Sequence, residues 1–124
     1  MDKINFVEKF TQIHEFYKPH VAAELNGQMV KLVKFDSEFV WHHHDHEDEL
    51  FLVVKGRFRM EYREPEGRER HEWIEPGEFI VIPRGVEHRP VAEEEVWVVL
   101  FEPGSTLNTG NVVNERTVAE LGHI

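Results

Sequence analysis

The sequence predicts an all-β fold, a sandwich or barrel of antiparallel strands, preceded by one N-terminal α-helix. Three observations support this prediction. After Pro19 short runs of β-forming residues alternate with turn residues at regular intervals, which is typical of seven or more strands. Residues 57–63 alternate apolar and charged side chains, as a half-buried strand does. The length of 124 residues is that of one domain.

The N-terminal helix is predicted within residues 3–17. Asn5 followed by Glu8 resembles a capping box, and Pro19 ends the run. Apolar side chains spaced by four, three and four residues would line one stripe of the helix: Phe6, Phe10, Ile13 and Tyr17.

The strands are delimited by turn signals between residues 26 and 104. These are Asn26-Gly27, Asp36-Ser37, the acidic stretch Asp45 to Asp48, Lys55-Gly56, Pro65-Glu66-Gly67, Pro76-Gly77, Pro83-Arg84-Gly85 and Pro103-Gly104. The segment from Val96 to Phe101 is apolar on both faces, so we expect it to lie between layers or under the helix or a second subunit. It is the main reason to expect a homodimer.

No repeat or linker divides the chain, so a single domain is expected. Within it, residues 1–19 would form the helix that packs on the barrel, residues 20–104 the barrel, and residues 105–124 a C-terminal extension with weak structural signals.

Composition excludes several function classes. The 14 basic and 24 acidic residues give a net charge of −10, which disfavours nucleic acid and anionic membrane surfaces as partners. The absence of cysteine excludes disulfides, thiolate metal sites and cysteine nucleophiles. No apolar stretch approaches the length of a membrane span, and the first residues do not resemble a signal peptide, so a cytoplasmic location is expected.

Four of the nine histidines fall between Trp41 and Asp48. In a strand, His42 and His44 would lie side by side on one face, where both rings can reach one metal ion. His46 would share that face if the strand continued, but the acidic run more plausibly turns the chain before Glu49. A solvated, histidine-rich surface turn is the alternative interpretation.

The spacing of residues around this cluster resembles the two-motif signature of the cupin superfamily, HxH(x)3-4E(x)6G followed by G(x)5PxGxxH. His42-x-His44 is followed by Glu49 and Gly56, and downstream by Gly77, Pro83, Gly85 and His88. Two positions depart from the pattern, because Asp36 stands where the family often has Gly and Ala92 where it often has Asn.

The resemblance implies a double-stranded β-helix, also called a jelly roll, with metal ligands His42, His44, Glu49 and His88. Three imidazoles and one carboxylate suit one divalent transition metal, which would be Fe, Mn, Ni, Zn or Cu, and leave open positions for ligands. The competing ligand pair His44 and His46 fits the spacing before Glu49 poorly.

The resemblance fixes the site better than the reaction, because cupins carry many functions. The first hypothesis is a metal-dependent enzyme acting on a small organic molecule, most simply a dioxygenase. An isomerase acting on a sugar phosphate ranks second among the enzymes, since it needs an added base and a cationic phosphate cradle. The alternatives are a metal-containing module that binds or senses a small molecule without turnover and, last, a structural protein.

Apolar strand residues could surround the metal or simply form the core. They are Phe51, Val53, Phe58, Met60, Tyr62, Phe79, Val81, Val98 and Leu100. Arg84 could meet an anionic substrate near His88, although a solvent-exposed turn arginine is the simpler expectation.

Overall fold

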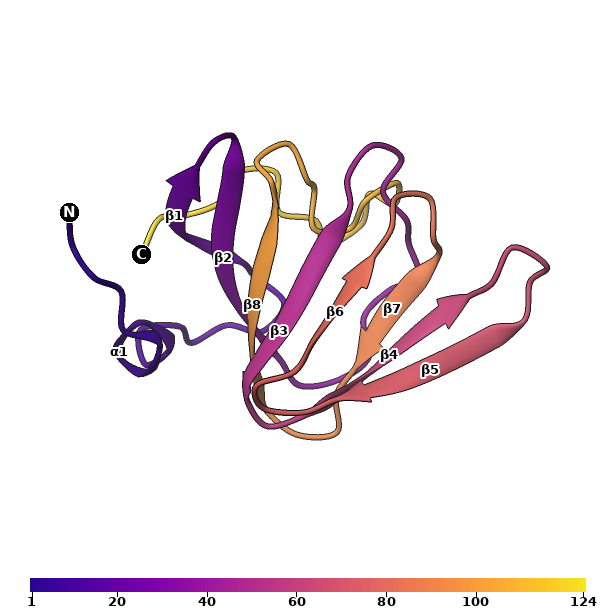
Figure 1. Ribbon diagram of the computed structural model, residues 1–124, viewed down its shortest axis with the longest axis horizontal. Coiled ribbons are helices and arrows are strands. Elements are labelled where there is room, and N and C mark those ends of the chain that lie inside the picture. The colour runs from indigo at the N-terminus through magenta and orange to yellow at the C-terminus, as the bar shows by residue number, and fades with distance from the viewer.

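The computed structural model describes residues 1–124 as eight strands in two antiparallel sheets with one short helix, which confirms the predicted β-barrel (Figure 1). Its elements are α1 (Phe6–Phe10), β1 (His20–Leu25), β2 (Gln28–Phe35), β3 (Glu49–Lys55), β4 (Phe58–Arg63), β5 (Glu69–Ile74), β6 (Phe79–Ile82), β7 (His88–Val91) and β8 (Val96–Pro103). The helix α1 is not long and apolar enough to cross a lipid bilayer.

The larger sheet has the strand order β1-β2-β8-β3-β6 and the smaller one β5-β4-β7. Their facing sides enclose a core of 14 buried residues that includes Phe35, Phe51, Phe58 and Val98. The side-chain alternation of β3 places Glu49, Phe51 and Val53 on this inner face. The same alternation therefore directs the first residue of β3, a carboxylate, into the barrel.

The N-terminal helix is much shorter than the predicted residues 3–17. Asn5 caps it as expected, accepting a hydrogen bond from the Glu8 backbone at 2.9 Å, but the α-helix ends at Phe10 and turns follow. The reason is that Phe10 packs on the outer face of the large sheet, whereas Tyr17 packs inside the barrel between Phe35 and Phe39. One straight helix cannot deliver both side chains to opposite faces of the same sheet.

The doubly apolar strand β8 is covered on both faces. Its inner face belongs to the core, and on its outer face the ring of Trp97 stacks on Phe10 with centroids 5.0 Å apart. Phe10 and Ile13 are fully buried in this second cluster together with Leu32 and Val99. The predicted cover for this strand is therefore supplied in part by the N-terminal segment.

The C-terminal segment after β8 runs along one end of the sheets and returns to β1 (Figure 1, yellow). It is tied to β1 by backbone hydrogen bonds from Val21 to Gly122 and from Ile124 to Val21, both 2.9 Å long. Along the way Asn111 donates its backbone N–H to the His43 carbonyl at 3.0 Å and accepts the His43 N–H on its side chain at 2.8 Å. The segment therefore lies against the residues of the histidine cluster.

Candidate metal centre and its pocket

The structure brings His42, His44, Glu49 and His88 together at this end of the barrel. One ligand atom from each lies within 4.8 Å of the others, and all four residues are buried, with exposed fractions of 0–4%. Buried ionisable groups gathered in this way need a partner to offset their desolvation. A buried group of three imidazoles and one carboxylate could bind a metal ion.

Backbone pairing holds two of the histidines opposite each other. His42 and His88 exchange both backbone hydrogen bonds, at 3.0 and 2.8 Å, as an isolated antiparallel bridge. A tight turn at the acidic run would pair the histidine segment with the strand that begins at Glu49. Instead β3 pairs with β6 and β8, and the 42–44 segment pairs with the chain around Gly85 and His88.

The tautomers of His42 and His88 follow from their hydrogen bonds. The Nδ1 atom of His42 lies 2.8 Å from the Val40 carbonyl, and that of His88 lies 2.8 Å from the Val86 carbonyl. A carbonyl oxygen only accepts, so Nδ1 carries the proton and Nε2 keeps a free lone pair. This is the usual second contact of a metal-binding imidazole.

Three polar atoms in the cluster have no hydrogen-bond partner: the Nε2 atoms of His44 and His88, and Oε1 of Glu49. That oxygen lies 3.2 Å from His44 Nε2 and 3.3 Å from His88 Nε2. Neighbouring donors bound to one ion at bond lengths of about 2.1 Å are themselves about 3 Å apart. The orphaned atoms and their spacing thus fit a single metal ion.

Electrostatics favour the protonation states that ligands require. Burial, followed by the nearby His88 ring, lowers the pKa of His42 to about 3, so its imidazole is neutral. Burial alone raises the pKa of Glu49, but the adjacent side chains of Glu102, His44 and His88 hold it well below its ordinary range. The carboxylate of Glu49 is therefore ionised.

A buried lysine lies behind Glu49. Lys31 donates to Glu102 Oε1 at 2.8 Å and to the Thr106 carbonyl at 3.2 Å, and Lys31 and Glu102 are 1% and 2% exposed. Burial and the charge of Glu49 raise the pKa of Glu102 well above its ordinary value, although Lys31 opposes this. The Glu49 carboxylate is thus one end of a line of buried charged and polar groups from β2 through β8 to β3.

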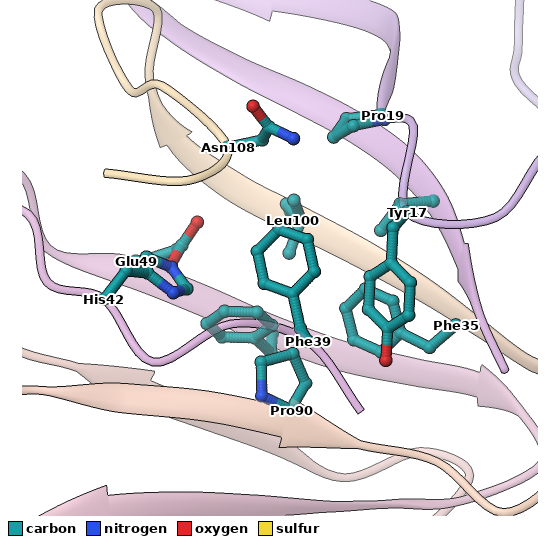
Figure 2. Close-up of a pocket in the computed structure, with 11 residues that line it drawn as sticks. Tyr17, Pro19, Phe35, Phe39, His42, Glu49, Pro90, Leu100 and Asn108 are labelled. Carbon is teal, nitrogen blue, oxygen red and sulfur yellow. The ribbon is translucent and has the colours of Figure 1, made fainter. Parts of the chain in front are cut away.

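A narrow, mostly apolar pocket opens beside His42 and Glu49. Figure 2 shows these two side chains on one side, Tyr17 stacked with Phe35 on the other, and Phe39 between them. The cavity between these walls is small, about 30 Å³. Its lining is completed by Pro19, Val33, Phe51, Pro90, Leu100 and Asn108. The candidate centre is therefore bordered by a narrow, mostly apolar cavity.

Several sequence-based expectations can now be corrected. His46 is exposed and lies outside the cluster, which agrees with the poor fit of the alternative ligand pair His44 and His46. Of the apolar strand residues, Phe51 and Leu100 line the pocket, whereas Phe79 and Val81 are exposed on β6. These two residues occupy the outer face of the edge strand, which the period of the pattern alone could not distinguish from the inner one.

Other side chains singled out in the sequence have local partners. Arg84 makes an ion pair with Asp48 at 3.3 Å on the surface. His43 points away from the cluster and contacts Glu87 and Asp45, and the hydrogen bond to Glu87, more than any other contact, raises its pKa. Neither residue belongs to the buried group.

Sequence reasoning missed much of the pocket wall. Tyr17 and Pro19 come from the segment assigned to the helix, and Phe39 from a stretch before the histidine motif. Asn108 comes from the extension, whose composition gave no signal. Only the Tyr17 ring, as an apolar position in a helical stripe, had been marked as buried, and it was assigned to the wrong layer.

Comparison with known proteins identifies chains that are similar in sequence and fold. A family model described as "Cupin domain" matches residues 28–106. A crystal structure of a cupin-2 domain containing protein from Shewanella frigidimarina is 41% identical, with 81% of this chain and 93% of that chain covered and a TM-score of 0.75.

More distant structures share the fold alone. Hydroquinone 1,2-dioxygenase from Sphingomonas sp. TTNP3 with 4-hydroxybenzoate bound is 17% identical with a TM-score of 0.74, and the match covers 84% of this chain but 32% of that one. The hydroquinone 1,2-dioxygenase PnpCD in complex with Cd²⁺ and 4-hydroxybenzonitrile is 18% identical with a TM-score of 0.66, covering 77% and 69%. A PnpCD structure with Fe³⁺ is 14% identical with a TM-score of 0.65, covering 72% and 28%.

Proposed function

The chain belongs to the cupin domain family, and we propose that it is a metal-dependent dioxygenase acting on a small organic molecule. His42, His44, Glu49 and His88 would hold one divalent transition metal ion. The observation that carries the proposal is the set of buried, unpartnered ligand atoms on His44, Glu49 and His88. Unsatisfied polar atoms at this depth are costly unless something binds them.

The protein's own contribution is to hold the ligands and keep the site dry. The Val40 and Val86 carbonyls fix two imidazoles with Nε2 free. The rings of Phe39 and Phe51 form apolar walls of the space beside His42. A bound iron(II) ion would supply the redox chemistry and the open positions for substrate and O₂. The dioxygenase assignment is further supported by the shared fold with hydroquinone 1,2-dioxygenases.

Elemental analysis tests the metal part of the proposal. Protein purified without a tag, chelator or nickel resin is compared with His88→Ala and with His71→Ala, an exposed histidine that serves as the matched control. We expect about one equivalent of iron, manganese or nickel in the wild type, loss in His88→Ala and retention in His71→Ala. Equal loss in both variants, or no metal in any of them after anaerobic Fe(II) addition, contradicts the metal site.

Oxygen uptake tests the reaction. Iron-loaded protein is screened with small phenols and carboxylates, and we expect uptake that His88→Ala abolishes and His71→Ala leaves unchanged. Stoichiometric metal without uptake would instead favour a binding module, and zinc alone would favour the isomerase or binding interpretations.

A homodimer through the outer face of the large sheet is a second part of the proposal. Phe79, Val81 and Phe101 are 61%, 47% and 37% exposed, and Leu50 pairs with both Val81 and Phe101. These side chains form an apolar area on the face beyond the cover of Phe10. Sedimentation of the wild type and of a Val81→Glu variant tests it, with a dimer expected for the first and a monomer for the second. A monomeric wild type at micromolar concentration contradicts the dimer.

A further inference from the structure

Arg116 is the one arginine of this chain without a carboxylate partner. The other seven each lie within 4.0 Å of an Asp or Glu oxygen: Arg57, Arg59, Arg63, Arg68, Arg70, Arg84 and Arg89. In a protein with 24 acidic residues and a net charge of −10, Arg116 is thus the exception among the arginines. Its surroundings therefore call for a physical account.

The guanidinium of Arg116 lies over two rings that form the pocket wall. Its Cζ atom is 5.1 Å from the centre of the Tyr17 ring and 5.7 Å from that of Phe39. The Phe39 ring is in turn 5.4 Å from the His42 ring. The Phe39 ring thus lies near both the candidate metal centre and the guanidinium of Arg116, and both Phe39 and Tyr17 line the pocket.

The backbone of the extension holds Arg116 in this place. Its N–H donates to Asn114 Oδ1 at 2.9 Å, and its carbonyl accepts from Asn108 Nδ2 at 2.7 Å. Asn108 itself lines the pocket and also accepts the Val118 N–H at 2.9 Å. A hydrogen-bonded turn therefore sets the position of this half-buried arginine. The five N–H donors of its guanidinium have no carboxylate of the protein as a partner.

We propose that Arg116 binds the carboxylate of the substrate, and that the substrate class is the small planar monocarboxylate, an aromatic acid above all. This deepens the proposed function and rests on it, since it assumes that a small molecule reaches the His42 end of the pocket. A guanidinium presents paired N–H groups that match the two oxygens of a carboxylate. The aromatic rings of Tyr17, Phe35 and Phe39 line the pocket and offer apolar surface to a planar ligand.

Arg84 shows the contrast that makes the inference specific. It precedes His88 closely in sequence, yet its side chain is 62% exposed and its charge is paired with Asp48. Burial and the charges of Asp36 and Glu38 raise the pKa of the Tyr17 hydroxyl, but neither carboxylate forms an ion pair within 4.0 Å of Arg116. The cation that remains available to a ligand is the one in the extension.

Calorimetric titration of benzoate and of benzamide, its neutral counterpart of nearly the same shape, tests the proposal. The titration uses metal-depleted full-length protein, so that carboxylate coordination to a metal cannot contribute. The variants are Arg116→Gln, Arg116→Lys and, as matched control, Arg70→Gln, which removes the same charge from the exposed pair with Glu64. Thermal unfolding of each variant reports whether the extension keeps its fold.

We expect the wild type to prefer benzoate over benzamide by about tenfold or more, since a charge-assisted contact is worth that factor. Arg116→Gln should abolish the preference, Arg116→Lys should keep part of it, and Arg70→Gln should keep it all. A preference that survives in Arg116→Gln, or no benzoate binding to the wild type up to about 10 mM, overturns the inference.

Metal content separates failure of this inference from failure of the proposed function. Stoichiometric metal with equal affinity for the two probes overturns the role of Arg116 and leaves the metal site intact. The converse result, a benzoate preference that depends on Arg116 in a protein that binds no metal, supports the anion site and removes the dioxygenase.

Discussion

Replacing Gly110 by alanine is the sharpest perturbation of the contact between the C-terminal segment and the histidine cluster. Gly110 has a φ of +55°, and a Cβ atom built there would lie 2.2 Å from the His43 carbonyl oxygen and 3.1 Å from Cδ2 of His42. Ordinary contact of this kind needs at least 3.4 Å. The segment must therefore withdraw by about 1 Å or more.

The cost follows from what this withdrawal breaks. The left-handed conformation costs alanine about 1 kcal/mol. The two hydrogen bonds between Asn111 and His43, at 3.0 and 2.8 Å, would be lost at about 1 kcal/mol each. We expect a loss of about 3 kcal/mol in the free energy of unfolding, which for a chain of this size lowers the Tm by about 10 °C.

Gly67→Ala is the matched control, because Gly67 also has a positive φ, +92°, but has no atom within 4 Å of a built Cβ. It should cost the strain alone, about 1 kcal/mol. Both variants and the wild type are unfolded by urea in the metal-free form. If Gly110→Ala lowers the free energy of unfolding no more than Gly67→Ala does, the segment does not contact the histidine cluster as described.

Three further predictions concern the buried charges and the outer layer. Lys31→Met leaves Glu102 without its 2.8 Å partner and should lower the free energy of unfolding in urea by about 3 kcal/mol. Adding Glu102→Gln should recover at least half of that loss, and a double variant as unstable as the single one contradicts the prediction. The pKa of His42 falls from about 6.5 unfolded to about 3 folded, so its contribution to metal-free stability is complete above pH 6.5 and is lost towards pH 3, by about 4 kcal/mol; a flat profile between these pH values refutes it. Phe10→Ala should cost about 3 kcal/mol through the lost stack on Trp97, and the half-exposed Phe6→Ala less than about 1 kcal/mol, as measured by thermal unfolding.

The strand pattern and the candidate ligands were predictable because both depend on local spacing. Alternation in β4 and the turn residues between strands follow from the pleat of the chain, and His42-x-His44 shares a face for the same reason. What spacing could not reveal is pairing at long range. That His42 bridges His88 rather than the strand of Glu49 depends on how the sheets close, which no local pattern encodes.

The pocket wall was less predictable because its residues come from irregular segments. Tyr17 adopts a φ of +57° and enters the barrel after the helix has ended, so its helical spacing to Ile13 was misleading. Asn108 lies in a polar extension whose asparagine turns have no periodic signature. Both positions are fixed by tertiary contacts, which override the local pattern.

The attachment of the C-terminal segment at both ends determines how it can move. At one end it continues from β8, and at the other end Gly122 and Ile124 form backbone hydrogen bonds with Val21. A chain held at both ends cannot swing aside like a free tail; it can only bow outwards as a loop. Amide hydrogen exchange at Val21 and Asn111 would report the rate of that movement, and weakening the hydrogen bonds at Val21 would speed it without altering any residue of the histidine cluster.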